Sequence, residues 1–383
     1  MTEIKIKDLR GVGDVELNLD DSKRVFVFFG SNGVGKTKTL EALLLLSLKQ
    51  TKEFDFFPDD YELSKQAIIG LRKPFRAIQL NNIEHLLKDM DDIPHIIDYR
   101  SFFKLKNVTT FQAVAFLGAK ARTHLTESKM YNSYSNSLGS FEERKRKFMG
   151  LISYSIASNE LTSLGMSQDI NQWFIERATS VNPYQKEEDN RKVDIDTVLN
   201  ALNILDSRIE KTLKIDGDGN VFLTIEGRER ELSELSSGFI SVVKIIQSII
   251  SAYSAFTNAT DLLNVKGVVL IDEIESHLHT EWQTKIVPTL KNLFPNTTFY
   301  IATHSPLVLS QLAEGEAYLL KRDNDNVVRS EKINSPNTRL LANVLQDTFG
   351  VDLNTLKRDN MANIDQSQAK QRLLDLLNSK AQP

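Results

Sequence analysis

The sequence predicts an α/β fold built on a largely parallel β-sheet. Three short runs, residues 24–29, 268–271 and 298–302, are rich in β-branched, aliphatic and aromatic residues, which is typical of strands covered by helices on both faces. Helical spacing surrounds these runs. Strands and helices that alternate in this way form a sheet whose ligand sits at the carboxyl ends of the strands.

Two other pairs of segments predict β-hairpins. Residues 3–7 and 15–19 alternate polar and apolar side chains on either side of a turn with two glycines. Residues 213–215 and 221–225 flank the sequence Asp-Gly-Asp-Gly-Asn, whose residues favour tight turns.

The regular pattern stops after residue 50 and resumes near residue 200. Between these positions aromatic and charged residues are mixed, and helical and extended patterns interleave without a repeat. We therefore predict a core that is split by a large, mainly helical insertion. The predicted parts are the N-terminal part of the core at 1–50, the insertion at 51–200, the C-terminal part of the core at 201–330 and a helical extension at 331–383.

Composition excludes several classes of protein. The 383 residues include 26% charged and 41% hydrophobic residues, as in a globular protein with a buried core. A net charge of -4 argues against a globally basic nucleic-acid binder, although a local basic stripe stays possible. Without cysteine there can be no disulfide, thiolate zinc site or cysteine nucleophile, which fits a reducing compartment.

The apolar runs do not predict a membrane protein. Residues 43–48 are too few to span a bilayer, and polar residues interrupt the run at 239–263. We interpret both as buried helices. The N-terminus is charged where a signal peptide needs an apolar stretch, so we expect a cytoplasmic protein.

A glycine-rich loop carries the strongest chemical signal. It fits the phosphate-binding (Walker A) pattern G-x-x-x-x-G-K-[ST] and lies between a predicted strand and a predicted helix, a context that a chance glycine-rich turn would lack. Its amides would surround phosphate groups, the lysine would reach the β- and γ-phosphates, and the threonine hydroxyl would bind Mg²⁺. The loop consists of Gly30, Ser31, Asn32, Gly33, Val34, Gly35, Lys36 and Thr37.

Two polar segments follow predicted strands. Asp272 and Glu273 come directly after residues 268–271; Asp272 would hold the metal and Glu273 would polarise an attacking water. His304 follows residues 298–302, where it could bond the γ-phosphate or that water. The alternative for Asp272 and Glu273 is an acidic helix cap, and the alternative for His304 is a packed histidine. The presence of the glycine-rich loop favours the catalytic interpretation of both segments.

A fourth segment, Leu-Ser-Ser-Gly-Phe at residues 235–239, opens an apolar helix. Serine hydroxyls and unpaired amides at a helix N-terminus can contact an anion. An ordinary helix cap is the alternative, because serine is common at that position.

The order of these four segments resembles that of the ABC-type P-loop ATPases, especially the SMC-like and OLD-like branch. The resemblance covers about residues 1–50 and 225–325. It implies that ATP and Mg²⁺ are bound in a head-to-tail dimer, in which Ser236 and Gly238 contact the γ-phosphate held by the opposite subunit. Residues 275–279 match a segment that runs past the dimer interface.

Two further positions are carried over from the resemblance. Arg10 corresponds to a position near the nucleotide, although a plain surface charge is the alternative. Gln79 is the candidate for the metal-contacting glutamine of the family. The sequence departs from the pattern at Phe239, where many transport ATPases carry glutamine.

The resemblance extends to ATPase subunits of bacterial antiphage systems of the Septu, retron-linked and PARIS types. It implies an ATPase that gates a separately encoded effector, a nuclease or toxin, since no second active site is evident. The alternative is a DNA-repair or chromosome-maintenance ATPase that binds DNA directly. No membrane domain or sustained heptad pattern is present, which argues against transport and against a long coiled coil.

Two charged segments have simpler interpretations. Asp323 and Asp325 form an Asp-x-Asp sequence in a polar stretch that is typical of a turn rather than a metal site. The run at residues 142–147 could touch nucleic acid but is more typical of a solvated helix face.

Overall fold

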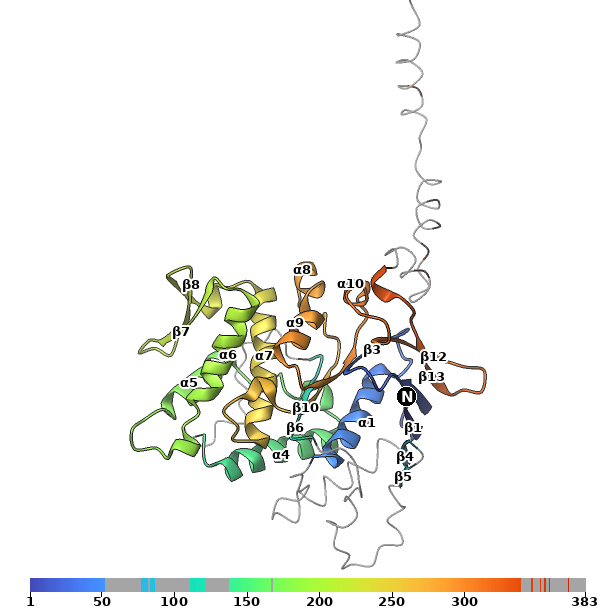
Figure 1. Cartoon of the computed structure of the whole chain (residues 1–383), viewed down its shortest axis with the longest axis horizontal. Coiled ribbons are helices and arrows are strands. Elements are labelled where there is room, and N and C mark those ends of the chain that lie inside the picture. Colours follow the sequence, from blue (N-terminus) through green and yellow to red (C-terminus); the bar gives the residue numbers. More distant parts are fainter. Residues whose placement is uncertain are drawn as a thin grey trace, which may run out of the picture. The chain divides into compact units, whose positions relative to one another are not determined.

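The fold was obtained as a computed structural model (Figure 1), which describes residues 1–51, 77–81, 83–86, 111–120, 138–166 and 168–338, and positions 346, 352, 355, 358 and 371. The chain divides into two compact units, Met1–Thr338 and Arg339–Pro383. Most of the predicted C-terminal extension therefore lies outside the described residues.

One mixed sheet forms the centre of the first unit. Its strands follow the order β5, β4, β1, β2, β13, β12, β3, β11, β10, β6. Neighbours from β12 to β6 all run parallel, whereas β5, β4, β1 and β2 pair antiparallel. The strands are β1 (Thr2–Leu9), β2 (Gly13–Leu19), β3 (Val25–Phe29), β4 (Ala77–Leu80), β5 (Ile83–Leu86), β6 (Ala113–Leu117), β10 (Gly267–Ile271), β11 (Thr298–Ala302), β12 (Ala317–Arg322) and β13 (Val328–Lys332).

Helices cover the parallel half of this sheet. Every residue of β3, β6 and β10 is buried, which confirms the two-sided burial predicted for β3 and β10. In Figure 1, α1 and α7 lie beside these strands, and both pack against β6. The helices of the described residues are α1 (Lys36–Lys49), α4 (Phe141–Ser158), α5 (Ile170–Thr179), α6 (Lys192–Leu205), α7 (Ser237–Phe256), α8 (Thr280–Gln283), α9 (Ile286–Leu293) and α10 (Pro306–Leu309).

The two apolar runs are buried helices, as predicted. Residues 43–48 lie in α1 and are all buried. α7 is the one helix of the described residues that is long and apolar enough to cross a membrane, but nearly all of it is covered by the rest of the protein.

Part of the segment predicted as an insertion belongs to the main sheet. Strands β4 and β5 extend its antiparallel end, and β6 pairs in parallel with β10. A five-residue apolar run such as β6 carries no period that separates a strand from a helix, so the sequence did not reveal its role. The described residues from 138 to 200 form helices joined by turns, without a strand, and the boundaries at 51 and 200 stay a prediction.

A small second sheet leads into α7. It consists of β7 (Ile209–Ile215), β8 (Val221–Ile225) and β9 (Arg228–Glu231), paired antiparallel in that order. β7 and β8 confirm the predicted hairpin, whose turn is closed by amides of Asp218 and Asn220 that donate to the Asp216 carboxylate. β9 was not predicted because its sequence, Arg-Glu-Arg-Glu, contains no apolar residue.

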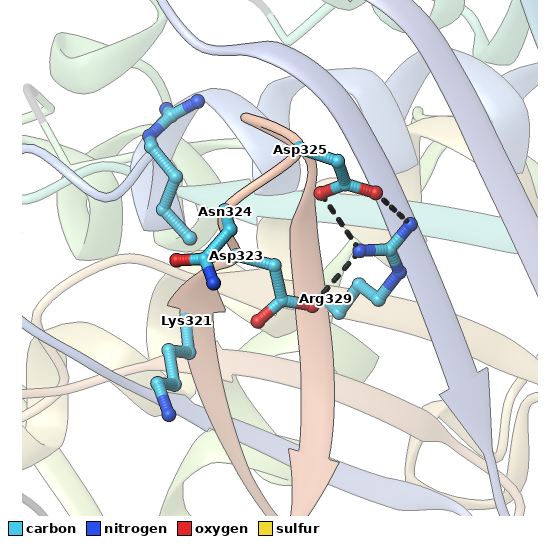
Figure 2. A pocket seen from close by; sticks show the side chains of 6 residues that line it. Lys321, Asp323, Asn324, Asp325 and Arg329 are labelled. Carbon is cyan, nitrogen blue, oxygen red and sulfur yellow. Dashed lines mark hydrogen bonds and ion pairs between the residues drawn. The ribbon is translucent and has the colours of Figure 1, made fainter.

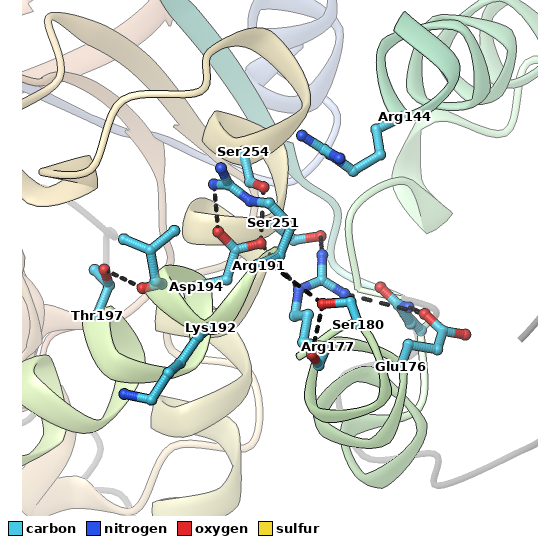
Figure 3. Close-up of polar contacts among 12 residues, drawn as sticks. Arg144, Glu176, Arg177, Ser180, Arg191, Lys192, Asp194, Thr197, Ser251 and Ser254 are labelled. Atoms are coloured by element: carbon cyan, nitrogen blue, oxygen red, sulfur yellow. Dashed lines mark hydrogen bonds and ion pairs between the residues drawn. The ribbon is translucent and has the colours of Figure 1, made fainter. Parts of the chain in front are cut away.

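A buried ion-pair network joins α5, α6 and α7 (Figure 3). The Asp194 carboxylate, which is fully buried, accepts hydrogen bonds from Arg191 Nη2 (2.6 Å), Arg177 Nε (3.2 Å) and the Ser254 hydroxyl (2.7 Å). The Arg177 guanidinium also lies 4.1 Å from the centre of the Trp173 ring. The two arginines thus share the Asp194 carboxylate, and Arg177 also lies 4.0 Å from a carboxylate oxygen of Glu176.

We expect Asp194→Asn to lower the free energy of unfolding by about 3 kcal/mol, because it leaves buried guanidinium groups without their counter-charge. Denaturant titration would measure the change. The control is Asp196→Asn on the same helix, which removes an exposed ion pair with Lys192 and should cost less than about 1 kcal/mol. Equal losses in the two variants would contradict the importance of the network.

Candidate active site

Three loops that are distant in the sequence meet at one edge of the sheet. β11 lies between β3 and β10 and is parallel to both, so the carboxyl ends of all three strands point the same way. Backbone hydrogen bonds continue past the strand ends, from Thr303 N–H to the Phe28 carbonyl (3.1 Å) and from Ile274 N–H to the Ala302 carbonyl (3.3 Å). The glycine-rich loop, Asp272 with Glu273, and His304 are therefore neighbours, as predicted.

The glycine-rich loop can be formed only with glycine at two positions. Gly30 has a φ of 148°, and a Cβ atom there would lie 2.7 Å from the Leu320 carbonyl oxygen. Gly35 has a φ of 110°, and its Cβ would lie 2.6 Å from a methyl group of Val12. Left-handed backbone and close neighbours together exclude a side chain. Helix α1 begins at Lys36, directly after Gly35, so its first amides adjoin the loop.

The side chain of Lys36 folds back onto the glycine-rich loop. Its ammonium group donates to the carbonyl oxygens of Gly30 (2.8 Å) and Ser31 (3.1 Å). Burial lowers the pKa of Lys36 to about 8, against the opposing effect of the Asp272 carboxylate. A partly desolvated cation in a glycine-rich loop at the start of a helix suits a polyanion such as a nucleotide phosphate chain.

Thr37 and Asp272 form the candidate metal pair. The Thr37 hydroxyl lies 2.9 and 3.2 Å from the two oxygens of Asp272, whose side chain is buried. Hard oxygen donors are the ligands that Mg²⁺ prefers, usually one or two from the protein and the rest from phosphate and water. The described residues contain no group of three or more acidic, histidine or cysteine side chains that would hold a metal alone. The pair therefore fits Mg²⁺ bound together with phosphate.

The structure does not bring Gln79 to this pair. Gln79 lies in β4, opposite Lys5 of β1, and the strands β1, β2, β13 and β12 stand between β4 and β3. The metal role of Gln79 was chosen by resemblance without a local motif, and this position gives it no support.

Glu273 directs its carboxylate from a tight turn. The residue has a φ of 46°, a left-handed conformation that is uncommon outside glycine and recurs at functional sites. The Ser276 hydroxyl donates to its Oε2 atom at 3.0 Å, and Ser276 N–H closes the turn onto the Glu273 carbonyl at 2.8 Å.

His304 is held through its backbone. Its N–H donates to Oε1 of Glu275 at 2.7 Å, and the neighbouring Thr303 hydroxyl donates to Oε2 at 2.5 Å. Burial, and secondly the charge of Lys36, lower the pKa of the half-buried imidazole, so His304 is neutral at pH 7. The sequence placed Glu275 only in a segment near a dimer interface. It did not reveal the bond from His304 to Glu275, because a contact between residues this far apart leaves no local sequence pattern.

The Leu-Ser-Ser-Gly segment places Ser236 on the surface. Ser236 caps α7 by accepting a hydrogen bond from Phe239 N–H (3.3 Å), and its neighbour Ser237 is also exposed. Gly238 is buried, and a Cβ there would lie 3.3 Å from backbone and side-chain atoms of His279. The start of α7 thus packs on the segment after β10. Contact of Ser236 and Gly238 with the nucleotide of another subunit stays a prediction.

Arg10 lies near the glycine-rich loop. It is exposed in the turn between β1 and β2, and Val12 of the same turn packs against Gly35. Arg322, at the end of β12, donates to the Val12 carbonyl at 2.7 Å and so holds the turn beside the loop. This position is compatible with the predicted role of Arg10 near the nucleotide.

The Asp-x-Asp sequence is a hairpin turn. Figure 2 shows Asp323 and Asp325 bound by Arg329, at 2.8 Å and 2.7 Å, beside an open polar pocket between β12 and β13. Asn326 N–H closes the turn onto the Asp323 carbonyl (3.0 Å). The prediction of a polar turn is confirmed.

The charged run at the start of α4 is partly internal. Arg144 is buried and donates to Asn258 Oδ1 (2.7 Å) and the Gly139 carbonyl (2.9 Å), while Lys147 pairs with Glu143 (3.1 Å). These contacts favour the interpretation of residues 142–147 as a solvated helix face, anchored to the protein by Arg144, over a nucleic-acid contact.

Comparisons with known proteins find one matching family model and several similar proteins. A model of the family described as "AAA domain, putative AbiEii toxin, Type IV TA system" matches residues 174–310. These residues include Ser236, Asp272, Glu273 and His304, while the glycine-rich loop lies outside them. The Septu protein PtuA of Bacillus thuringiensis is 24% identical over 91% of this chain and 84% of its own length.

The chain is also similar to probable ATPases of retrons. The Retron Vc95 probable ATPase of Vibrio cholerae is 34% identical over 28% of this chain, but this match covers 22% of the retron protein. A second Septu PtuA, from Bacillus mycoides, is matched over 42% of its length. An SMC head bound to part of ScpA covers 88% of this chain and 99% of its own with a TM-score of 0.43 and 11% identity.

The histidine pKa gives a direct test of the site geometry. We expect the imidazole of His304 to titrate below pH 6.5 in an NMR titration, because burial and Lys36 disfavour its charged form. His304→Gln identifies the resonance by its loss. Lys36→Met should move the midpoint upward, since it removes a nearby positive charge, and a wild-type midpoint above 6.5 would refute the described environment.

Proposed function

We propose that the chain hydrolyses Mg-ATP between two copies of itself. The observation that supports this most is the meeting of Lys36, the Thr37–Asp272 pair, Glu273 and His304 at one edge of the sheet. Each has a simple structural explanation alone, but together they supply phosphate binding, metal binding and a general base within one site. The Septu and retron relatives carry the same implication, because the retron proteins are named as probable ATPases.

Each residue has a role that follows from its position. Lys36 and the amides at the start of α1 bind phosphate oxygens, and Thr37 and Asp272 hold Mg²⁺, which neutralises phosphate charge when bound. Glu273 orients a water molecule and accepts its proton. Neutral His304 offers a hydrogen bond to that water or to the γ-phosphate.

The dimer completes the site with Ser236. This hydroxyl and the amides at the start of the 20-residue helix α7 lie at an exposed, positively polarised helix end. In the proposed head-to-tail arrangement they contact the nucleotide of the other subunit, together with Gly238.

The similarity to Septu and retron proteins supports a proposal for the cellular role. We propose a cytoplasmic defence ATPase that gates a separately encoded nuclease or toxin, with nucleic acid as a candidate partner. Co-purification with the product of a neighbouring gene would support this role. Hydrolysis stimulated by DNA, with a steep salt dependence and no such partner, would favour the repair ATPase instead.

Glu273→Gln is the test of the proposed hydrolysis. We expect turnover to fall at least about 100-fold while ATP binding persists, because the base is lost and the phosphate and metal sites remain. The variant should also accumulate as an ATP-bound dimer, visible by light scattering. Glu142→Gln, an exposed carboxylate in the first turn of α4, is the matched control and should behave like the unmodified chain. Unchanged turnover in Glu273→Gln would refute its role as base.

A further inference from the structure

The carboxylate of Glu275 joins two of the active-site loops. It extends from the turn after β10, and both of its oxygens accept hydrogen bonds from the loop after β11: Oε1 from His304 N–H at 2.7 Å and Oε2 from the Thr303 hydroxyl at 2.5 Å. Hydrogen bonds to an ionised carboxylate are short and about twice as strong as neutral ones. Glu275 is thus the main side-chain link between these loops.

Further contacts make this link stiff. Thr303 is fully buried, and its hydroxyl oxygen also accepts a bond from Ser305 N–H at 3.0 Å. The Ser305 hydroxyl in turn donates to Gln283 of α8 at 2.7 Å. The loop after β11 is therefore attached to the chain after β10 at both ends, by Glu275 and by Gln283.

The same turn also holds the candidate base. Ser276, next to Glu275, donates to the Glu273 carboxylate at 3.0 Å. One turn of four residues thus fixes Glu273 through Ser276 and the His304 backbone through Glu275. Because both Glu275 oxygens are occupied by the loop after β11, the geometry disfavours a role for Glu275 as a second base or a metal ligand.

We propose that Glu275 is a positioning residue, which sets the place of His304 relative to Glu273 and the phosphate-binding loop. This inference rests on the proposed hydrolysis of ATP. The hydrogen bonds carry the effect rather than the negative charge, since glutamine can accept from His304 N–H and donate to the Thr303 hydroxyl. Misplacement of a reacting group by about 1 Å can cost on the order of 100-fold in rate.

The test compares Glu275→Ala and Glu275→Gln in steady-state hydrolysis of Mg-ATP by the full-length chain. We expect Glu275→Ala to lower kcat about 10- to 100-fold with an ATP dissociation constant within about threefold of wild type. Glu275→Gln should restore kcat to within about threefold of wild type. Glu142→Ala controls for the loss of an exposed carboxylate, and thermal unfolding checks that each variant is folded.

A double variant separates positioning from a general structural effect. If Glu275 acts through His304, Glu275→Ala should lower kcat little further when combined with His304→Ala, whereas independent effects would multiply. Thr303→Val keeps the shape of the side chain and removes the hydroxyl's bonds to Glu275 and to Ser305 N–H. It should give a smaller loss in the same direction, and it replaces Glu275→Ala in the test if that variant does not fold.

The outcomes are distinct. Multiplicative losses, a Glu275→Gln variant as impaired as Glu275→Ala, or full kcat in Glu275→Ala would each overturn the positioning role while leaving the proposed hydrolysis intact. Absence of turnover in the unmodified chain, with its gene neighbour present, would overturn the proposed function and this inference with it.

Discussion

The candidate site depends on the parallel pairing of β3, β11 and β10. Parallel neighbours end at the same edge of a sheet, so backbone hydrogen bonds bring the glycine-rich loop beside two loops that follow it by more than 200 residues. The register continues beyond the strands, through Thr303 N–H to Phe28 and Ile274 N–H to Ala302. Side-chain bonds from Glu275 and Gln283 then hold the loop after β11 against the chain after β10.

Close backbone approach adds a second constraint. Gly30 meets the Leu320 carbonyl and Gly35 meets Val12, so the glycine-rich loop is enclosed by β12 on one side and by the β1–β2 turn on the other. Arg322 fixes that turn by its bond to the Val12 carbonyl. The loop is therefore shaped by its neighbours as well as by its own glycines, which agrees with the preorganisation that phosphate binding requires.

The sequence was sufficient where a local pattern determines the structure. The runs that form β10 and β11, the hairpin of β7 and β8, and the glycine-rich loop each have a composition or spacing with one main structural solution. It was insufficient where the structure depends on distant partners. β6 is a strand because β10 lies beside it, and β9 has no apolar residue but completes the sheet that begins with β7.

The site shows the same division. Asp272 and His304 could be found because each follows a recognisable strand, whereas the bond from Glu275 to the His304 backbone crosses 29 positions and leaves no trace in the sequence. Gln79 is the contrasting case: it was chosen without a local pattern, and it lies on β4, which four strands separate from β3. Resemblance is most useful where a motif fixes the position of each residue.

The chain after β10 connects the two parts of the proposed dimeric site. On one side Glu275 and Gln283 bind the loop that carries His304; on the other, His279 packs directly against Gly238 at the start of α7. Ser236, two residues before Gly238, is exposed where a second subunit would contact it. Close-packed atoms transmit displacement because they leave no free volume to absorb it. A subunit that binds at Ser236 therefore contacts the start of α7, which packs against His279 of the chain after β10. The proposed closure of the dimer and the geometry of hydrolysis thus depend on the same short stretch of chain.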